Sequence, residues 1–324
     1  MKLATFSARD EPSRVGLVDP EAGRVRDLYA LAKTTKGVDA TIFTSMVALI
    51  ESGDAGLAQS AELSEIVKRG NVDGLALSQV ALHAPLPVPS QIRDCSVFEE
   101  HIRDAPVGMS RLKTSLGIGT ADIARAEVPA IYRSQPIYYI SNRFGVTGPD
   151  TQVAWPRYSA VMDFELEVAV VIGRRCKDVA VERAADQIFG FTILNDFSAR
   201  DQQAKEMMGG LGPTKGKSFD CGNAMGPWIV TRDEIDLPID LAAEVRVNGE
   251  TWAKTRTVGM LHGISEMISF ISADETLHPG EVIGTGTVGG CCGLEMGQFL
   301  TDGDTVELIV ERIGTLRNTV KRQV

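Results

Sequence analysis

Apolar and polar positions alternate over much of the second half of the chain, which predicts a strand-rich protein. In the longest such stretch, residues 163–173, the acidic residues Asp163, Glu165 and Glu167 occupy alternate positions of an otherwise apolar run. Further strands are expected at 3–7, 15–18, 24–28, 191–196, 244–247 and 250–252, and the last two flank Asn248-Gly249, a pair that favours a tight hairpin turn. Helical spacing occurs at 41–52, 61–69, 182–189 and 259–271. Because no regular β-α-β alternation runs through the chain, the pattern indicates the α+β class.

A proline-rich junction divides the chain. Pro85, Pro87 and Pro89 stand at every second position, which excludes a helix and favours an extended connector. We therefore expect a small N-terminal α+β domain over residues 1–85 and a larger domain over residues 86–324. The first segment brings no titratable groups together, so the chemistry is expected in the second.

Composition narrows the classes of function. The chain has 324 residues, 44% hydrophobic and 23% charged, which is typical of a globular protein. Its net charge of -10 argues against nucleic acid or an anionic membrane as the main partner. No apolar run approaches the roughly 20 residues that span a bilayer, and the first residues lack a signal-peptide core, so a cytoplasmic location is expected. The cysteines have no Cys-x-x-Cys spacing and are expected to be reduced core residues.

The acidic run at 163–167 is the first indication of chemistry. Alternate residues of a strand point to the same face, so Asp163, Glu165 and Glu167 are expected to lie side by side. Carboxylates at such short distances repel one another unless a cation neutralises them. Oxygen ligands of this kind suit Mg²⁺, Mn²⁺ or Ca²⁺. The alternative is an edge strand whose acidic face meets water.

A second acidic cluster follows at the end of the apolar run 191–196. If this strand pairs with the strand of Glu165 and Glu167, with helix 182–189 as the crossover between them, Asp196 joins the two glutamates in a ligand set that Mg²⁺ prefers. Arg200 is then within reach of an anionic group held by the metal. Its alternative role is an ion pair with Asp201 or another acid.

The third cluster surrounds one of the few histidines. Ser96 and Glu99 have the spacing of a capping box, so a helix is expected to begin here. His101 and Asp104 then fall on one face, where the carboxylate could orient the imidazole as a general base. A surface histidine is the alternative.

These clusters, in this order, resemble the fumarylacetoacetate hydrolase family over residues 89–320. The resemblance is carried by Asp94 followed by His101, Asp163-Phe-Glu-Leu-Glu167, Asn195-Asp-Phe-Ser-Ala-Arg-Asp201-Gln-Gln203, Gly216-Lys217, Gly226-Pro-Trp228, Thr285-Gly-Thr287 and Gly303-Asp304-Thr-Val-Glu-Leu308. It implies a mixed β-sandwich roll for the larger domain, and a homodimer. It also implies a lid at about 104–116, which we expect to be ordered only with ligand.

The resemblance also implies roles for individual residues. The metal ligands would be Glu165, Glu167 and Asp196, with Asp94 as a possible fourth. His101 would be the base, assisted by Asp104 or Glu307, and Lys217 would stand beside the leaving group, unless it is a solvated loop lysine. The remaining matches, expected to line the substrate pocket, are Tyr139, Arg200, Gln203 and Thr287.

The implied function is divalent-metal-dependent hydrolysis of a carbon-carbon bond in a 2,4-dioxo acid, such as an acylpyruvate, through a metal-stabilised enolate. An isomerase, decarboxylase or dehydratase acting on a 2-oxo acid uses the same enolate and is the main alternative. A non-catalytic ligand-binding homologue is a further one. Gly284-Thr-Gly286-Thr-Val-Gly289 satisfies a dinucleotide-binding pattern, but the glycine- and cysteine-rich residues after it do not open a helix, so we expect no nucleotide cofactor.

Overall fold

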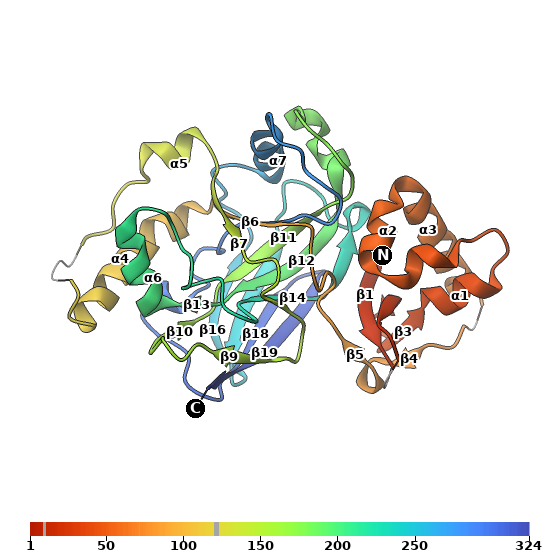
Figure 1. Ribbon diagram of the computed structural model, residues 1–324, viewed down its shortest axis with the longest axis horizontal. Coiled ribbons are helices and arrows are strands. Elements are labelled where there is room, and N and C mark those ends of the chain that lie inside the picture. Colours follow the sequence, from red (N-terminus) through yellow and green to blue (C-terminus); the bar gives the residue numbers. More distant parts are fainter. Residues whose placement is uncertain (9–10, 71, 120–122, 324) are drawn as a thin grey trace.

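The predicted strand-rich α+β class is confirmed by the computed structural model, which describes residues 1–8, 11–70, 72–119 and 123–323 (Figure 1). Within these residues the main sheet is 12-stranded and runs in the order β4-β3-β2-β1-β14-β12-β11-β17-β6-β7, with β5 beside β1 and β8 beside β14. Its strands are β1 (Lys2–Ser7), β2 (Arg14–Asp19), β3 (Arg24–Asp27), β4 (Leu75–Ala76), β5 (Ala81–Leu82), β6 (Ile92–Ser96), β7 (Ile137–Ser141), β8 (Val146–Thr147), β11 (Leu166–Ile172), β12 (Ile188–Asp196), β14 (Asn223–Thr231) and β17 (Val282–Gly284).

A second, 5-stranded sheet runs in the order β16-β15-β18-β19-β9, and β10 pairs with β13 alone. These strands are β9 (Gln152–Trp155), β10 (Met162–Asp163), β13 (Ser198–Ala199), β15 (Ala242–Val247), β16 (Glu250–Arg256), β18 (Thr305–Val310) and β19 (Gly314–Arg322). The predicted hairpin is present between β15 and β16, where Asn248 and Gly249 have φ of 53° and 82°. Positive φ at both positions is what such a two-residue turn requires.

The helices flank the sheets (Figure 1). They are α1 (Leu28–Thr34), α2 (Met46–Glu51), α3 (Gly53–Arg69), α4 (Glu99–Ser115), α5 (Ala130–Ser134), α6 (Arg200–Glu206), α7 (Ile264–Ser272) and α8 (Gly293–Met296), with 3-10 turns η1 (Ala40–Thr44), η2 (Leu77–Gln79), η3 (Val181–Gln187), η4 (Met207–Gly209) and η5 (Arg232–Glu234). No helix among the described residues has the length and apolar character needed to cross a membrane.

Several helix predictions need correction. The expected helix 41–52 is broken at Ser45, whose hydroxyl caps α2 by accepting from the Ala48 N–H. The helix expected at 61–69 begins earlier, at Gly53. Helix 182–189 is instead the 3-10 turn η3 between antiparallel strands β11 and β12, and helix 259–271 begins only at Ile264. The capping box at Ser96 does not form, because Ser96 is the last residue of β6 and the helix begins at Glu99.

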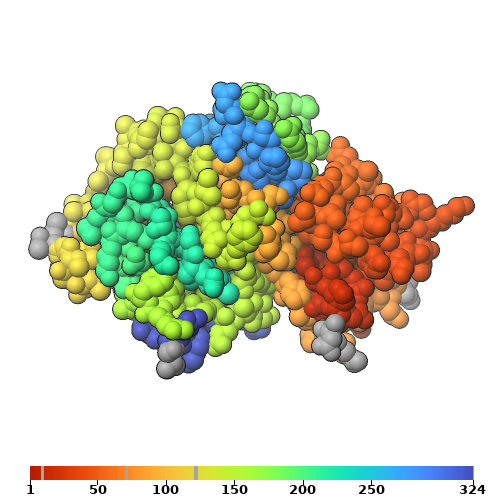
Figure 2. All heavy atoms as spheres, viewed as in Figure 1, coloured from red at the N-terminus to blue at the C-terminus, as the bar shows by residue number. Residues whose placement is uncertain are grey.

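The first segment of the chain extends the main sheet. Strand β1 pairs with β14, with Lys2 opposite Val230 and Leu3 opposite Ile229. Leu3 belongs to a buried cluster that also contains Ile229 and Val171 of the larger segment. The N-terminal residues form a lobe on one side of the molecule (Figure 1; red to orange in Figure 2). These contacts couple the N-terminal segment to the rest of the chain. The division into two domains at residue 85 stays a prediction.

Strand β11 lies in the centre of the main sheet, between β12 and β17. Every residue of this strand, from Leu166 to Ile172, is buried. The interpretation of this run as an edge strand with a wet acidic face is therefore wrong. The segment expected to be a lid, 104–116, is largely the second half of α4, which continues through Pro106 to Ser115.

Candidate active site

Three carboxylates converge on one face of the main sheet. Glu167 on β11 is opposite Leu194 of β12, and Asp196 lies two residues further along β12, which places the two acids on the same face. Asp94 comes from β6, where it is opposite Gly284 of β17. Carboxylate oxygens of Asp94, Glu167 and Asp196 lie within 4.8 Å of one another, and all three residues are buried.

Gly284 has no Cβ atom, and this leaves space for two of these carboxylates. A Cβ atom at Gly284 would stand 2.6 Å from Glu167 Oε2 and 2.7 Å from Asp94 Oδ1. The nearby Gly286 N–H donates to Glu167 Oε2 at 3.0 Å. The hydroxyl of Tyr139 lies 2.7 Å from Asp196 Oδ2 and 3.1 Å from Asp94 Oδ2. Since one hydroxyl carries one proton, it satisfies these oxygens only in part.

The donor set fits a hard divalent cation. Asp94 Oδ1 and Asp196 Oδ1 are buried and have no hydrogen-bond partner among the described residues. Burial raises the pKa of Asp94 and of Glu167 well above the usual values, and the neighbouring Asp196 raises both further. Buried oxygens that repel one another and lack donors are the ligands that Mg²⁺, Mn²⁺ or Ca²⁺ satisfies.

Glu165 lies beside this group but points at two cations. It follows β10 and is not part of β11, so the regular alternation expected over 163–167 is broken. One oxygen accepts from Arg200 Nη2 at 2.6 Å, and the other accepts from the ammonium of Lys217. Burial alone would raise the pKa of Glu165, but Arg200 and Lys217 outweigh it and hold this pKa well below its usual range. In this arrangement Asp94, and not Glu165, completes the carboxylate group.

Lys217 is buried, which excludes a solvated loop lysine. Its ammonium donates to Glu165 Oε2 and to Asp196 Oδ2. Burial disfavours the charged form, but Asp196 and Glu165 outweigh it and raise the pKa of Lys217. The lysine therefore stays protonated next to the carboxylate group.

The guanidinium of Arg200 forms hydrogen bonds to three side chains and also supplies a buried positive charge. Its Nε donates to Asp163 Oδ2 at 2.7 Å, its Nη2 to Glu165 and its Nη1 to Gln203 Oε1 at 2.8 Å. The alternative role of Arg200, an ion pair with Asp201 or another acid, is therefore observed, with Asp163 and Glu165 as the partners. Asp201 instead accepts from the Ser159 hydroxyl and the Ala160 N–H.

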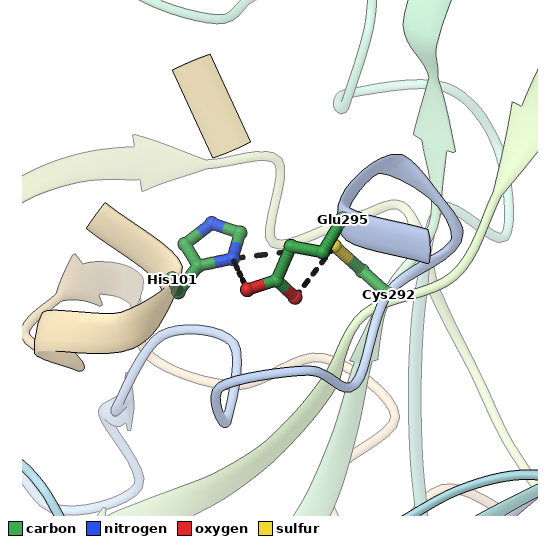
Figure 3. Close-up of side chains that lie close together, drawn as sticks. All are labelled: His101, Cys292 and Glu295. Atoms are coloured by element: carbon green, nitrogen blue, oxygen red, sulfur yellow. Dashed lines mark hydrogen bonds and ion pairs between the residues drawn. The ribbon is translucent and has the colours of Figure 1, made fainter. Parts of the chain in front are cut away.

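The structure gives His101 an acidic neighbour that neither prediction named. His101 Nδ1 lies 3.4 Å from Glu295 Oε1, and the Cys292 thiol lies 3.1 Å from Glu295 Oε2 (Figure 3). Burial disfavours the imidazolium, but the hydrogen bond to Glu295 and its charge outweigh burial and raise the pKa of His101. The charge of Glu165 raises the pKa of His101 further, and the charge of Arg200 opposes this effect.

Of the two carboxylates expected to assist His101, Asp104 has another partner and Glu307 lies in the second sheet. Asp104 shares the helix with His101, but it receives Arg125 Nε at 2.5 Å and Nη2 at 2.8 Å. Glu307 lies on β18 of the second sheet, opposite Arg246 of β15 and Arg317 of β19. These two arginines pair with Glu244 and Asp150, so Glu307 is placed here by its strand register alone.

The other predicted pocket residues gather around the same place. Tyr139 contacts Asp94 and Asp196, and Gln203 accepts from Arg200. Thr287 is buried in the turn after β17, one residue beyond Gly286. Sequence reasoning missed Glu295 and Cys292. The available signal was weak: Glu295 lies in the first turn of a short helix that begins at Gly293, a few residues after Thr287.

Comparisons with known proteins agree on one family. A family model described as fumarylacetoacetate (FAA) hydrolase C-terminal matches residues 112–321. Oxaloacetate tautomerase YisK of Bacillus subtilis is 33% identical over 327 residues, covering 99% of this chain and 100% of that protein. The 2,4-didehydro-3-deoxy-L-rhamnonate hydrolase of a Sphingomonas strain is 31% identical over 263 residues, 80% of this chain and 87% of that protein. The crystal structure of 5-carboxymethyl-2-hydroxymuconate delta-isomerase from Mycobacterium smegmatis has a TM-score of 0.68 and 28% identity, and each chain is covered in full.

Proposed function

Because the chain belongs to the fumarylacetoacetate hydrolase family, we propose that it is a divalent-metal-dependent enzyme that turns over a 2-oxo acid through an enolate. The observation that carries the proposal is the group of buried oxygens from Asp94, Glu167 and Asp196, which lack sufficient hydrogen-bond donors and stand beside a protonated lysine. A protein gains no stability from gathering buried carboxylates in this way, whereas enolate chemistry needs a strong positive charge at one place.

The ion would be held by Asp94, Glu167 and Asp196, and Mg²⁺, Mn²⁺ and Ca²⁺ all suit these ligands. A divalent cation supplies positive charge that polarises a 2-oxo group and stabilises the enolate formed from it. The predicted ligand role of Glu165 is replaced in this proposal by a role in holding Arg200 and Lys217.

The reaction that we propose first is enol–keto tautomerisation of a 2-oxo dicarboxylate such as oxaloacetate. The full-length similarity to an oxaloacetate tautomerase supports it. The Nδ1 side of His101 faces Glu295, so its Nε2 is left for the substrate (Figure 3). His101 would accept the hydroxyl proton of the enol at Nε2 and return a proton to the adjacent carbon. Lys217 would stabilise the negative charge on oxygen between these two transfers.

The hydrolysis expected from the sequence is the second candidate. Similarity to a hydrolase over most of this chain supports it. The same His101 and Glu295 would then deprotonate a water, which attacks the remote carbonyl of a 2,4-dioxo acid. The carbon-carbon bond breaks, a carboxylic acid is released, and the leaving enolate of pyruvate takes up a proton.

One assay separates the two reactions. Purified protein with Mg²⁺ or Mn²⁺ is given oxaloacetate in its enol form, followed by ultraviolet absorbance, and an acylpyruvate, followed by release of pyruvate and the second acid. We expect faster loss of the enol than with the H101N variant. If only the acylpyruvate is consumed, the second candidate replaces the first. If neither substrate reacts faster than with H101N under any of the ions, the proposed function is wrong.

A further inference from the structure

The side chains of His101, Cys292 and Glu295 form a compact group that shares no residue with the carboxylate cluster of Asp94, Glu167 and Asp196 (Figure 3). His101 lies in the first turn of α4, Cys292 directly precedes α8, and Glu295 lies within α8. Their nitrogen, sulfur and oxygen atoms lie within 4.8 Å of one another. We propose that this group is a second metal site, which binds a borderline-soft cation of the zinc type and thereby switches the enzyme off.

The distances already approach those of a zinc site. In a tetrahedral site with ordinary zinc-ligand bonds, two ligand atoms stand about 3.3 to 3.6 Å apart. Here His101 Nδ1 is 3.4 Å from Glu295 Oε1 and 4.0 Å from Cys292 Sγ, and Cys292 Sγ is 3.1 Å from Glu295 Oε2. The two short contacts of Glu295 are made by different oxygens, so its carboxylate has to turn for one oxygen to face both His101 and Cys292. With one ligand atom taken from each residue, the three atoms already lie within 4.8 Å of one another.

The donor atoms separate this site from the carboxylate site. A thiolate, an imidazole and a carboxylate together select Zn²⁺ or Co²⁺, whereas the oxygen ligands of Asp94, Glu167 and Asp196 suit Mg²⁺. On binding, the Cys292 thiol loses its proton to solvent, as a thiol ligand must. A thiolate and a carboxylate then neutralise the two charges of the ion.

Neighbouring residues orient Glu295, and a cavity beside it gives access to an ion. Gly290 N–H donates to Glu295 Oε1 at 3.2 Å, which orients the carboxylate from outside the group. Glu295 also lines a cavity of about 520 Å³ whose other walls include Gly108, Arg111 and Ile123. The cavity gives an ion a route to Glu295 from the side of α4.

A cation at this place would remove the base. An imidazole that binds metal through Nδ1 and stays neutral carries its proton on Nε2. His101 would then have no lone pair to accept a proton from substrate. This loss of activity rests on the proposed function, in which Nε2 of His101 is the base. Binding of the ion is independent of the proposed function.

Binding is tested first, with Co²⁺ as the probe, on the full chain in excess Mg²⁺ so that the oxygen site is filled. We expect a thiolate-to-Co²⁺ charge-transfer band that Zn²⁺ abolishes by displacement. The band should disappear in C292S and persist in C291A, because Cys291 lies in the main core and outside the group. The variant H101Q, which keeps Cys292, should weaken Co²⁺ binding at least tenfold. A wild-type protein without the band, or a band unchanged in C292S, would overturn the proposal.

Inhibition is tested second, with each variant compared to its own rate in excess Mg²⁺ without Zn²⁺. Zn²⁺ in excess Mg²⁺ should abolish turnover of the 2-oxo acid in the wild type, and C292S should require at least tenfold more Zn²⁺ for half-inhibition. C291A should behave as the wild type. Zn²⁺ that binds with a thiolate signature and leaves turnover unchanged would support the metal site and overturn the switch, because His101 would not be the base. The spectrum is readable even if no 2-oxo acid is a substrate, so failure of the site and failure of the proposed function are distinguishable.

Discussion

At the scale of single residues, Lys217 has the most consequential surroundings. It is the cation that Glu165 and Asp196 share in the buried network. In K217M both carboxylates lose that partner, and breaking a buried ion pair in this way costs about 3 to 5 kcal/mol of stability. Lost stabilisation of the enolate should lower kcat by a further factor of about 10² to 10³.

The control for K217M is K215M, two residues away. Lys215 is exposed and its ammonium lies over the ring of Tyr158, so its replacement should change the melting temperature and kcat little. Thermal melts and steady-state kinetics of both variants make the comparison. A K217M protein as active as K215M would exclude Lys217 from the chemistry.

Glu295 controls the protonation of His101. Its removal in E295Q leaves the burial of the imidazole and takes away the charge that raises the pKa of His101, so this pKa falls. The base form of His101 is present above its pKa. In the wild type the rise of kcat/KM with pH should therefore lie above the usual histidine value of about 6.5, and in E295Q it should move to lower pH.

The loss of orientation should also lower kcat of E295Q by about 10²-fold. The variants D104N and E307Q are the matched controls, since Asp104 pairs with Arg125 and Glu307 lies between Arg246 and Arg317. Both should keep the pH profile of the wild type. A shift of the profile in D104N, and none in E295Q, would restore the original expectation for Asp104.

At the scale of elements, strand β17 determines how close the carboxylates come. In G284A the new Cβ would overlap Glu167 Oε2 and Asp94 Oδ1, both nearer than 3 Å in the present arrangement. These carboxylates have to move apart, so Mg²⁺ affinity should fall at least tenfold, as isothermal titration calorimetry would measure. The control G209A adds a Cβ where nothing lies within 4 Å and should bind Mg²⁺ normally. Equal affinities in the two variants would exclude the carboxylate group as the ion site.

The elements also explain what the sequence could and could not predict. The strands of Glu167 and Asp196 were predictable because a short run of apolar, often β-branched residues is a local signal, and the Asn248-Gly249 hairpin has a local turn signal. The contact between His101 and Glu295 was not predictable, because the two residues lie 194 positions apart in the chain and no local sequence pattern connects them. Asp104 had the right helical spacing, but Arg125, from the segment after α4, takes its carboxylate. Spacing along one helix says which side chains share a face, and it cannot say which partners arrive from elsewhere.

At the scale of the whole molecule, the N-terminal lobe contributes to the stability of the main sheet. Strand β1 covers the edge of β14, and Leu3 and Phe6 are fully buried. We expect a chain truncated to residues 86–324 to be insoluble or to unfold well below the full chain, because an apolar edge strand is exposed. In the full chain, F6A should cost about 3 to 5 kcal/mol in denaturant unfolding. A truncated chain that melts as the full chain does would support two independent domains.

The carboxylate cluster should make the stability of the whole protein depend on pH and metal together. The pKa of Asp94 and of Glu167 is raised on folding, so the folded protein holds protons that the unfolded chain releases above about pH 4. That contribution to stability is complete below the unfolded pKa and is lost as the pH rises toward the folded one. Without metal, the melting temperature should therefore fall as the pH rises above the usual carboxyl pKa of about 4. Mg²⁺ takes the place of these protons and should stabilise most at high pH, by about 2.7 kcal/mol at a hundred times its Kd.

The variant D94N makes this argument decisive, because it removes one of the repelling charges and one of the ligands together. At pH 8 without metal, D94N should melt above the wild type, since the remaining acids repel less and an amide is cheaper to bury than a carboxylate. Added Mg²⁺ should then raise the wild-type melting temperature and leave D94N nearly unchanged. A residue that destabilises the empty protein and is stabilised only by the ion is one retained for binding. If D94N melted below the wild type and still responded to Mg²⁺, the acidic group would be a structural network whose charges are already satisfied by Lys217 and Tyr139.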